Sequence, residues 1–311
     1  MHTFWCLQPK QYTTMNHRIL SFGILLFCTV TSLHAITFEI LKPKLLATNM
    51  KFTEGPAWDS KGYVVFSDID GNVIYTWSAK QGLDTLVFPA GNSNGILKNK
   101  KTGFIVCRHK ARDLVRMDEK GVFTPLISTY RGNKLNSPND LEQSKKGNLY
   151  FSDPDFGANT ASRELPYQGL FVLPANQQEV VLIDSSLQWP NGVTLVDAER
   201  TLLVCESKTN RVWSYKLNKQ GLVDNLATDK KLFVKVSGTG LVDGITTDKA
   251  GTIYIAFNRG GIRIFSRQAK ELGTIQIPSG EEVRNMCFGG NDGSTLFVTA
   301  GKSLYQIDLK N

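Results

Sequence analysis

One local pattern occurs six times along the chain: a turn that ends in a small residue, then a run of β-branched, aromatic and other apolar residues. Such runs favour β-strands. They begin 41, 44, 54, 50 and 43 residues apart. The runs are Gly62–Phe66, Gly103–Cys107, Gly147–Phe151, Thr201–Cys205, Gly251–Ile255 and Ser294–Val298. A second strand-like run follows each of them: Val73–Trp77, Asp113–Met117, Leu170–Leu173, Arg211–Leu217, Ile262–Ser266 and Ser303–Leu309.

Repeats of this length that carry several strands are typical of propeller blades. No segment sustains a 3.6-residue apolar period, which argues against a helical solenoid. We therefore predict an all-β fold, a six-bladed β-propeller with four antiparallel strands in each blade. Gly55–Asp59 exemplifies the inner strand. The outer strand is exemplified by Thr85–Phe88, Val180–Ile183 and Thr274–Ile277.

The last blade lacks a fourth strand before the chain ends at Asn311. Residues Lys44–Asn49, just before the first blade, are expected to supply that strand. This pairing would close the ring and remove the open edges of the sheets.

The first 35 residues resemble an export signal. An apolar run, Ile19–Val30, follows Arg18 and precedes a weak small-residue cleavage site at Thr31–Ala35. The run is too short to span a bilayer as a mature helix. We expect a signal peptide over 1–35, with Met15 as an alternative start, and a propeller domain over 36–311. A periplasmic or secreted location without stable membrane insertion follows; the alternative is a buried N-terminal helix.

Composition excludes several classes of function. The net charge of +8 falls to +6 without residues 1–35. The sequence has no dense run of basic residues, which argues against a nucleic-acid partner. His109 is the one histidine that remains after cleavage, so a His/Cys zinc site is nearly excluded. Cys107 and Cys205 fill strand positions held by apolar residues in other blades, and we expect them in the core, unpaired.

One polar residue per blade stands eight to ten residues before the small-residue marker. These residues are Glu54, Asn94, Asn139, Asn191, Asp243 and Asn285. Each begins an inner strand, so all six are expected to ring one mouth of the central channel. Turn chemistry accounts for any one of them, but not for six in register. Converging carboxylates and amide oxygens would repel one another without a cation. Oxygen donors select a hard ion, and a roomy channel favours Ca²⁺, with Mg²⁺, Mn²⁺ or Zn²⁺ as alternatives.

Five motifs are distributed along the blades: Glu54-Gly-Pro-Ala-Trp, Asn136-Ser-Pro-Asn-Asp140, Tyr150-Phe-Ser-Asp-Pro154, Trp189-Pro-Asn-Gly192 and Val242-Asp-Gly244. Together they resemble the gluconolactonase family, which includes senescence marker protein (regucalcin) and luciferin-regenerating enzyme. The resemblance runs from about residue 40 to the C-terminus and is closest to bacterial gluconolactonases around Asn136–Gly157.

The resemblance implies a propeller whose axial divalent metal catalyses lactone hydrolysis. It places metal ligands at Glu54, Asn191 and Asp243, and a metal or substrate contact at Asn139. Paraoxonase-type lactonases have a catalytic His where this chain has Asn94. Regucalcin-like members use an Arg two positions before the residue matched by Asn139. That position is Ser137 here, and Arg131 or Arg108 is expected to substitute.

A bound cation would polarise the lactone carbonyl and a water molecule. Asp243 is the candidate general base, and the role of direct nucleophile stays open. Glu54 would then be mainly a structural ligand. A polar and aromatic rim is expected to suit a polyhydroxylated substrate. The expected substrate-binding residues are Asn94, His109, Arg131, Asn136, Asn139, Asp153 and Asn285.

We therefore predict an exported, monomeric, metal-dependent carboxylic-ester hydrolase that acts on sugar-type lactones. Two alternatives stay open. One is a phosphotriester hydrolase that uses the same metal site, because a bound P=O group resembles a lactone carbonyl. The other is a non-catalytic binding propeller in which calcium only pins the fold.

Overall fold

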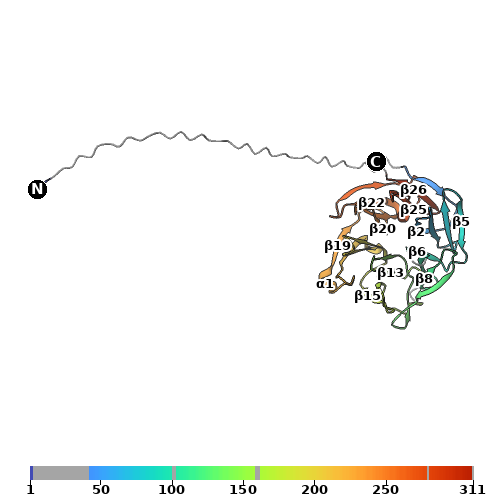
Figure 1. Cartoon of the computed structure of the whole chain (residues 1–311), viewed down its shortest axis with the longest axis horizontal. Helices are drawn as coiled ribbons and strands as arrows, with labels where there is room; N and C mark the ends of the chain where they lie inside the picture. The colour runs from blue at the N-terminus through green and yellow to red at the C-terminus, as the bar shows by residue number, and fades with distance from the viewer. Residues whose placement is uncertain (3–41, 100–102, 158–161, 279, 310–311) are drawn as a thin grey trace. The chain divides into compact units, whose positions relative to one another are not determined.

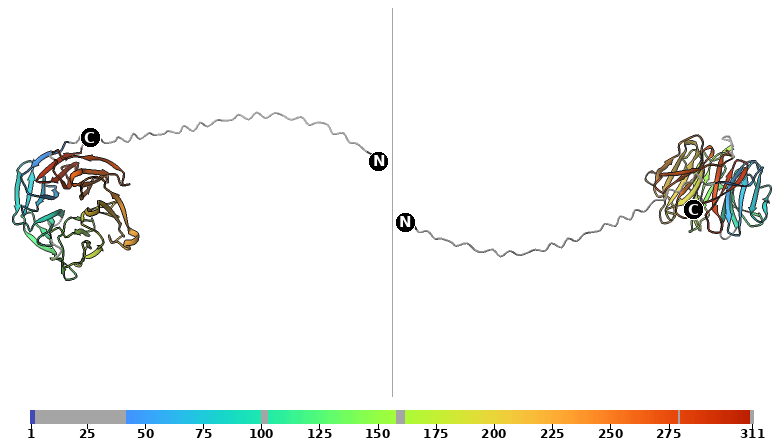
Figure 2. Two further views of the ribbon diagram at one scale, coloured as in Figure 1. Left: turned by 180° about the vertical axis from the view of Figure 1, so that it is seen from behind. Right: turned by 90° about the horizontal axis from the view of Figure 1, so that it is seen from above.

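The computed structural model describes residues 1–2, 42–99, 103–157, 162–278 and 280–309. The expected signal peptide over 1–35 lies almost wholly outside these residues. Thr37–Asn311 form one compact unit. Within that unit, six four-stranded antiparallel sheets surround a central axis, which confirms the predicted six-bladed propeller (Figures 1 and 2).

Each blade runs from an inner strand at the axis to an outer strand at the periphery. The inner strands are β2 (Thr53–Asp59), β6 (Ser93–Asn99), β12 (Leu141–Gln143), β16 (Pro190–Val196), β20 (Val242–Thr247) and β24 (Val283–Gly289). The second strands are β3 (Tyr63–Asp68), β7 (Gly103–Arg108), β13 (Leu149–Asp153), β17 (Thr201–Glu206), β21 (Ile253–Phe257) and β25 (Thr295–Ala300). The third strands are β4 (Val73–Ser78), β8 (Asp113–Met117), β14 (Gly169–Leu173), β18 (Arg211–Lys216), β22 (Gly261–Phe265) and β26 (Ser303–Asp308).

The outer strands depart most from the sequence-based ranges. They are β5 (Gly82–Val87), β9 (Phe123–Ile127), β15 (Val181–Asp184), β19 (Lys230–Lys235), β23 (Glu271–Ile275) and, in the last blade, β1 (Lys44–Ala47). The range Thr274–Ile277 was three residues late at its start and two at its end, because β23 begins at Glu271 and ends at Ile275. Outer strands have one solvated face, so their apolar pattern marks their ends only loosely.

The N-terminal strand closes the ring as predicted. β1 pairs antiparallel with β26, with Lys44 opposite Gln306 and Leu45 opposite Tyr305. The start of the domain is therefore paired with its last strand, and the first and last sheets both have four strands.

The remaining elements are small. A two-stranded hairpin, β10 (Thr129–Tyr130) with β11 (Asn133–Lys134), precedes β12. The helical segments among the described residues include α1 (Leu226–Asp229) and two 3₁₀ turns, Ser207–Thr209 and Asn258–Gly260. No helix within the described residues has the length and apolar character needed to cross a bilayer.

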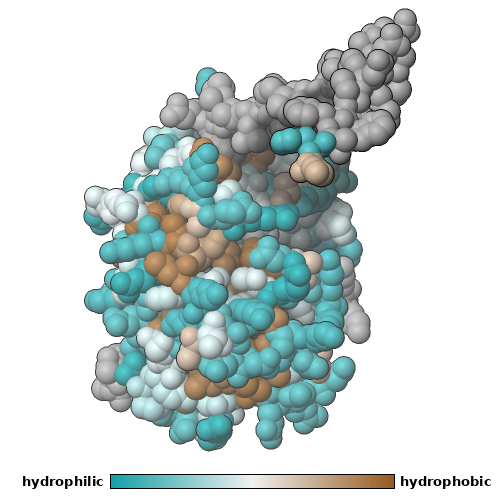
Figure 3. Space-filling view, turned by 90° about the vertical axis from the view of Figure 1, so that its left-hand side faces the viewer, coloured by the Kyte–Doolittle hydropathy of each residue, from teal (hydrophilic) through white to brown (hydrophobic). Residues whose placement is uncertain are grey.

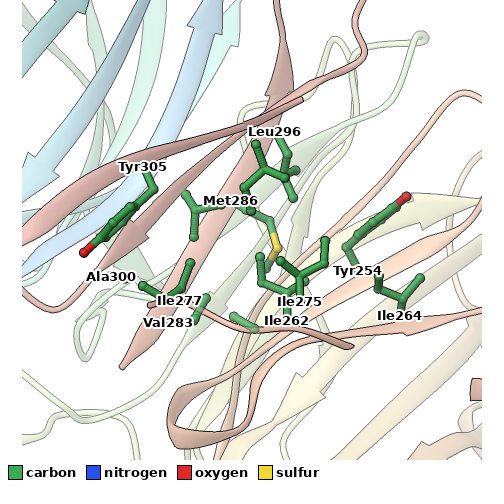
Figure 4. Close-up of a cluster of buried hydrophobic side chains, with 13 residues drawn as sticks. Tyr254, Ile262, Ile264, Ile275, Ile277, Val283, Met286, Leu296, Ala300 and Tyr305 are labelled. Atoms are coloured by element: carbon green, nitrogen blue, oxygen red, sulfur yellow. The ribbon is translucent and has the colours of Figure 1, made fainter. Parts of the chain in front are cut away.

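The core lies between neighbouring blades. In the cluster between the fifth and sixth blades, Ile262 and Ile275 face Met286 and Leu296 (Figure 4). Between the sixth and first blades, the rings of Trp58 and Phe297 stack with centroids 5.0 Å apart. Residues of each sheet thus pack against the next sheet, so the ring is stabilised as a whole rather than blade by blade.

Cys107 and Cys205 are fully buried free thiols in two different clusters, as predicted. The outside of the ring is mixed. On the face shown in Figure 3, hydrophilic residues predominate and hydrophobic residues form patches between them.

Candidate functional site

Irregular strand pairing turns the polar residues toward the axis. The pairing of inner and second strands shifts register between Glu54 and Ala57, and between Val242 and Ile245. Similar shifts occur between Ser93 and Ile96 and between Pro190 and Val193 in two other blades. A bulge at this point re-aims a side chain that regular pleating would direct into a sheet–sheet core.

A glycine after each bulged residue lets neighbouring blades approach closely. A Cβ on Gly55 would lie 2.1 Å from the Asn94 carbonyl oxygen, and one on Gly192 would lie 2.5 Å from the Asp243 carbonyl oxygen. Each such glycine therefore contacts the axial residue of the following blade. The Asn-Gly and Asp-Gly pairs of the sequence reflect this packing at the axis.

We expect Gly55→Ala to lower the free energy of unfolding by roughly 3–5 kcal/mol. The new Cβ would overlap backbone atoms that cannot move independently, and Gly55 has a φ of +48°. Urea denaturation followed by circular dichroism measures the loss. Gly82→Ala is the matched control, because Gly82 also has a positive φ but nothing lies within 4 Å of its Cβ position. Equal losses in the two variants would contradict the packing argument.

The axial residues meet in a cavity of about 310 Å³ at one mouth of the channel. Five of the six predicted axial side chains line it, and each is at most 7% exposed: Glu54, Asn94, Asn139, Asn191 and Asp243. His109 lines the same cavity and is 7% exposed. The structure thus brings together all four predicted metal ligands, the candidate catalytic Asp243 and three of the predicted substrate-binding residues.

Glu54 and Asp243 form a buried carboxylate pair. Burial raises the pKa of Glu54 well above its usual value, and the nearby charge of Asp243 raises it further. Burial also raises the pKa of Asp243 to about 7, against the opposing effect of the Arg284 guanidinium, whose Nη1 lies 3.8 Å from Oδ2. Both carboxyl groups would therefore resist ionisation without a further positive charge.

His109 fixes the orientation of Asn94. Asn94 Nδ2 donates to His109 Nε2 at 2.9 Å, which requires the proton of a neutral ring to be on Nδ1. Burial lowers the pKa of His109 to about 4, so the ring is neutral at physiological pH. The amide oxygen of Asn94 is left as a buried acceptor without a hydrogen-bond partner in the described structure.

These donors fit a hard divalent cation. Two buried carboxylates whose pKa values are raised, an unsatisfied amide oxygen on Asn94 and the amides of Asn139 and Asn191 surround one cavity. Oxygen-only donors of this kind suit Ca²⁺ or Mg²⁺. No group of three or more His, Cys, Asp and Glu side chains suited to a metal ion occurs among the described residues. A cation here would therefore depend on the asparagines as well as on the two carboxylates.

Asn285, the sixth axial residue, does not line the cavity in the described structure. Its Oδ1 accepts from the Met286 amide at 2.8 Å, and its side chain also bonds to Asp140. Asp140 occupies the position that glycine holds after the axial residue in four other blades. Its buried carboxylate, with a pKa raised to about 6, engages Asn285 and the Val193 amide instead.

Three other predicted substrate-binding residues also lie outside the cavity lining. Asn136 and Asp153 are fully buried, and the Asp153 carboxylate accepts from the backbone amides of Asn136 and Ser137 at 2.8 and 2.9 Å. They anchor the loop before Asn139. Arg131 is exposed in the β10–β11 hairpin, and its guanidinium lies 5.2 Å from the centre of the Tyr130 ring.

The sequence prediction omitted several residues that line the cavity. Arg284 directly precedes the axial Asn285, and its guanidinium lies 4.5 Å from the centre of the Phe52 ring. In the orientation that satisfies both amide atoms of Asn258, its oxygen accepts a hydrogen bond from Arg284 Nη1 at 2.5 Å and its nitrogen donates to the Leu241 carbonyl. Arg284 could have been found from the sequence because it directly precedes the predicted axial residue Asn285. The sequence contained no comparable feature that pointed to Asn258.

Comparison with known proteins identifies the family of this chain. Residues 52–302 match the SMP-30/Gluconolactonase/LRE-like region. A gluconolactonase from Zymomonas mobilis is 30% identical over 294 residues, covering 86% of this chain and 81% of the relative. The structure of a gluconolactonase from Xanthomonas campestris superimposes with a TM-score of 0.80 at 26% identity, covering 89% and 92% of the two chains.

A calcium-binding regucalcin from Agrobacterium tumefaciens shares the fold, with a TM-score of 0.71 at 19% identity over 87% of this chain and 96% of the other. The match to the family region spans every blade and includes Glu54, Asn191 and Asp243. On these grounds, the chain is a member of the SMP-30/gluconolactonase/LRE-like family.

Proposed function

We propose that the protein is a metal-dependent lactonase whose cavity holds a divalent cation, most simply Ca²⁺. The observation that supports this best is the buried Glu54–Asp243 pair beside the unsatisfied amide oxygen of Asn94. A binding propeller pinned by calcium would bury the same carboxylates, so turnover decides between it and the lactonase. Relatives described as gluconolactonases support the reaction class.

In this proposal, Glu54, Asn139, Asn191 and Asp243 hold the cation. When bound, the cation supplies Lewis-acid polarisation of the lactone carbonyl. Calcium suits these donors because it accepts irregular shells of six to eight oxygens. The fold relative from Agrobacterium is described as calcium-binding, which is consistent with this choice of ion.

Asp243 is assigned the role of general base. Its carboxylate accepts the proton of the water that attacks the carbonyl carbon, and the proton passes to the ring oxygen as the ring C–O bond breaks. Arg284, 3.8 Å from Oδ2, favours the ionised form of Asp243. His109 does not act as the base in this scheme, because its Nε2 accepts from Asn94. It positions the Asn94 amide instead.

We also propose that residues 1–35 direct export and that the mature domain works as a monomer in the periplasm or outside the cell. The apolar run Ile19–Val30 supports export. The closed ring supports the monomer, because every blade has its four strands within one chain.

Hydrolysis assays test the proposed function. Purified mature protein is mixed with D-glucono-1,5-lactone and with γ-butyrolactone, and acid release is followed with Ca²⁺ or with EDTA. We expect turnover with Ca²⁺ and at least about a hundredfold less with EDTA, while circular dichroism shows the same β-structure. Turnover that EDTA leaves unchanged would contradict the metal dependence. Absence of turnover on any lactone, with a folded calcium-loaded protein, would favour the binding propeller.

A further inference from the structure

Apolar side chains form much of the wall of the cavity above the carboxylate pair. Ile69, Phe156, Trp189 and Leu241 line it, and they come from loops of four different blades. Phe156 is 44% exposed and Leu241 is 39% exposed. Such side chains gain free energy when a ligand covers them, by about 25 cal/mol for each Å² of apolar surface removed from water.

Several apolar residues of the wall stand at the same distance along the chain from an axial residue. Trp189 stands two residues before Asn191, and Leu241 stands two residues before Asp243. Phe52, which supports Arg284, stands in the same relation to Glu54. The residue two positions before the axial residue is thus apolar and lines the cavity in three blades, beside three proposed cation ligands.

The residues that were expected to hydrogen-bond a polyhydroxylated ring are engaged elsewhere. Ser137, two residues before Asn139, is fully buried, and its hydroxyl donates to the Pro154 carbonyl at 2.7 Å. Arg108 forms a two-pronged ion pair with Asp113, at 2.8 and 2.6 Å. Arg131 lies on the β10–β11 hairpin. Neither Arg108 nor Arg131 therefore lines the cavity in the described structure, although one of them was expected to replace the arginine missing at Ser137.

The aromatic part of the wall is held in place. Trp189 has a φ of +56°, a region that bulky residues rarely occupy, and its backbone amide donates to Gln168 Oε1 at 2.9 Å. Lys208 Nζ lies 4.4 Å from the centre of its ring, and the Phe156 ring lies 5.7 Å away. Strained backbone that persists beside a binding cavity is a recognised mark of a functional position.

We infer that the lactone substrate carries an apolar substituent, an alkyl chain or an aromatic ring, which packs against Ile69, Phe156, Trp189 and Leu241. This inference rests on the proposed lactonase function and specifies its substrate class. It differs from the sequence-based expectation of a sugar-type lactone only in the substituent that meets the apolar wall, because polar side chains such as Ser207, Asn258 and Arg284 line the rest of the same cavity.

Paired substrates test the inference. γ-Nonalactone and γ-valerolactone share one five-membered ring and a secondary alkoxide leaving group, and their γ-substituents, pentyl and methyl, differ by four CH₂ groups. Each CH₂ that the wall covers is worth about fourfold in kcat/KM. With two or three of these carbons covered, we expect γ-nonalactone to exceed γ-valerolactone by roughly 15- to 60-fold in kcat/KM, and to exceed D-glucono-1,5-lactone as well.

Variants locate the effect. Leu241→Ala and Phe156→Ala should each lower the ratio of the two kcat/KM values by roughly fivefold. Leu232→Ala is the matched control, since Leu232 is 50% exposed on the outer strand β19 and should leave the ratio unchanged. Circular dichroism and thermal unfolding of each variant confirm that the fold is retained.

The outcomes separate the two proposals. A ratio near one, or a preference for D-glucono-1,5-lactone with no response to Leu241→Ala and Phe156→Ala, would overturn the apolar substituent and leave the lactonase standing. Hydrolysis of none of the three lactones would overturn both.

Discussion

Asp243→Asn is expected to lower kcat for lactone hydrolysis by about 10²- to 10⁴-fold, the usual contribution of a general base. Asparagine keeps the size and an amide oxygen for the cation but cannot accept the proton of the attacking water. The fold should not be weakened, because the change removes the charge that raises the pKa of Glu54. Initial rates of acid release and a urea titration measure the two effects.

Asp248→Asn is the matched control for that experiment. Asp248 follows the other end of the same inner strand, where its carboxylate accepts from the Thr252 amide at 2.8 Å, and an asparagine oxygen can accept the same bond. Its activity should equal that of the unchanged protein. A kcat for Asp243→Asn within tenfold of the unchanged protein would overturn the assignment of Asp243 as the base.

A single turnover in ¹⁸O-labelled water separates the two roles that were left open for Asp243. A general base delivers the label straight to the product carboxylate. A nucleophile forms an acyl-enzyme first, so the label enters the Asp243 carboxylate and the product of the first turnover is unlabelled. Mass spectrometry of the product and of the Asp243 peptide distinguishes these outcomes.

The second large effect concerns stability and pH. Burial raises the pKa of Asp243 from 3.8 to about 7, so without a cation the folded protein binds this proton more tightly than the unfolded chain does. The stabilising contribution of the proton is complete below pH 4 and is lost as the pH rises through 7. By linkage the loss amounts to about 4 kcal/mol. Glu54, whose pKa is also raised, acts in the same direction.

Calcium should offset part of this loss, because it binds the ionised carboxylates and replaces the missing proton. At a hundred times its Kd it adds about 2.7 kcal/mol, or roughly 5–10 °C in Tm. We expect that rise at pH 8 and a much smaller one at pH 5, by differential scanning calorimetry with Ca²⁺ or EDTA. Asp140, Glu142 and Asp153 also have raised pKa values, about 6, 7 and 7. Asp243→Asn therefore serves as the reference for the pH dependence of stability that these groups cause. An equal response to Ca²⁺ in this variant, or none in the unchanged protein, would contradict the site.

The blade count and the ring closure followed from local pattern. A strand that is buried on both faces must be apolar along its length, and six such runs, from Gly62–Phe66 to Ser294–Val298, recur at blade spacing. The missing strand of the last blade pointed to Lys44–Asn49, and β1 occupies Lys44–Ala47. Exposed outer strands carry a weaker pattern, which is why β23 was misplaced.

The sequence by itself determined that six polar residues recur in register near the starts of the inner strands, although Asn139 lies two residues before β12, and five of the six meet in one cavity. What the tertiary structure decided was the direction of each side chain. Asn285 turns to Asp140 because a carboxylate stands there in place of glycine, while Arg131 stays on an outer hairpin. Arg284 reaches the cavity as the second residue of β24, and Trp189 and Leu241 reach it from the loops before β16 and β20. Strand periodicity places a Cα on the ring, but side-chain direction depends on bulges and on neighbours from other blades, which local sequence does not encode.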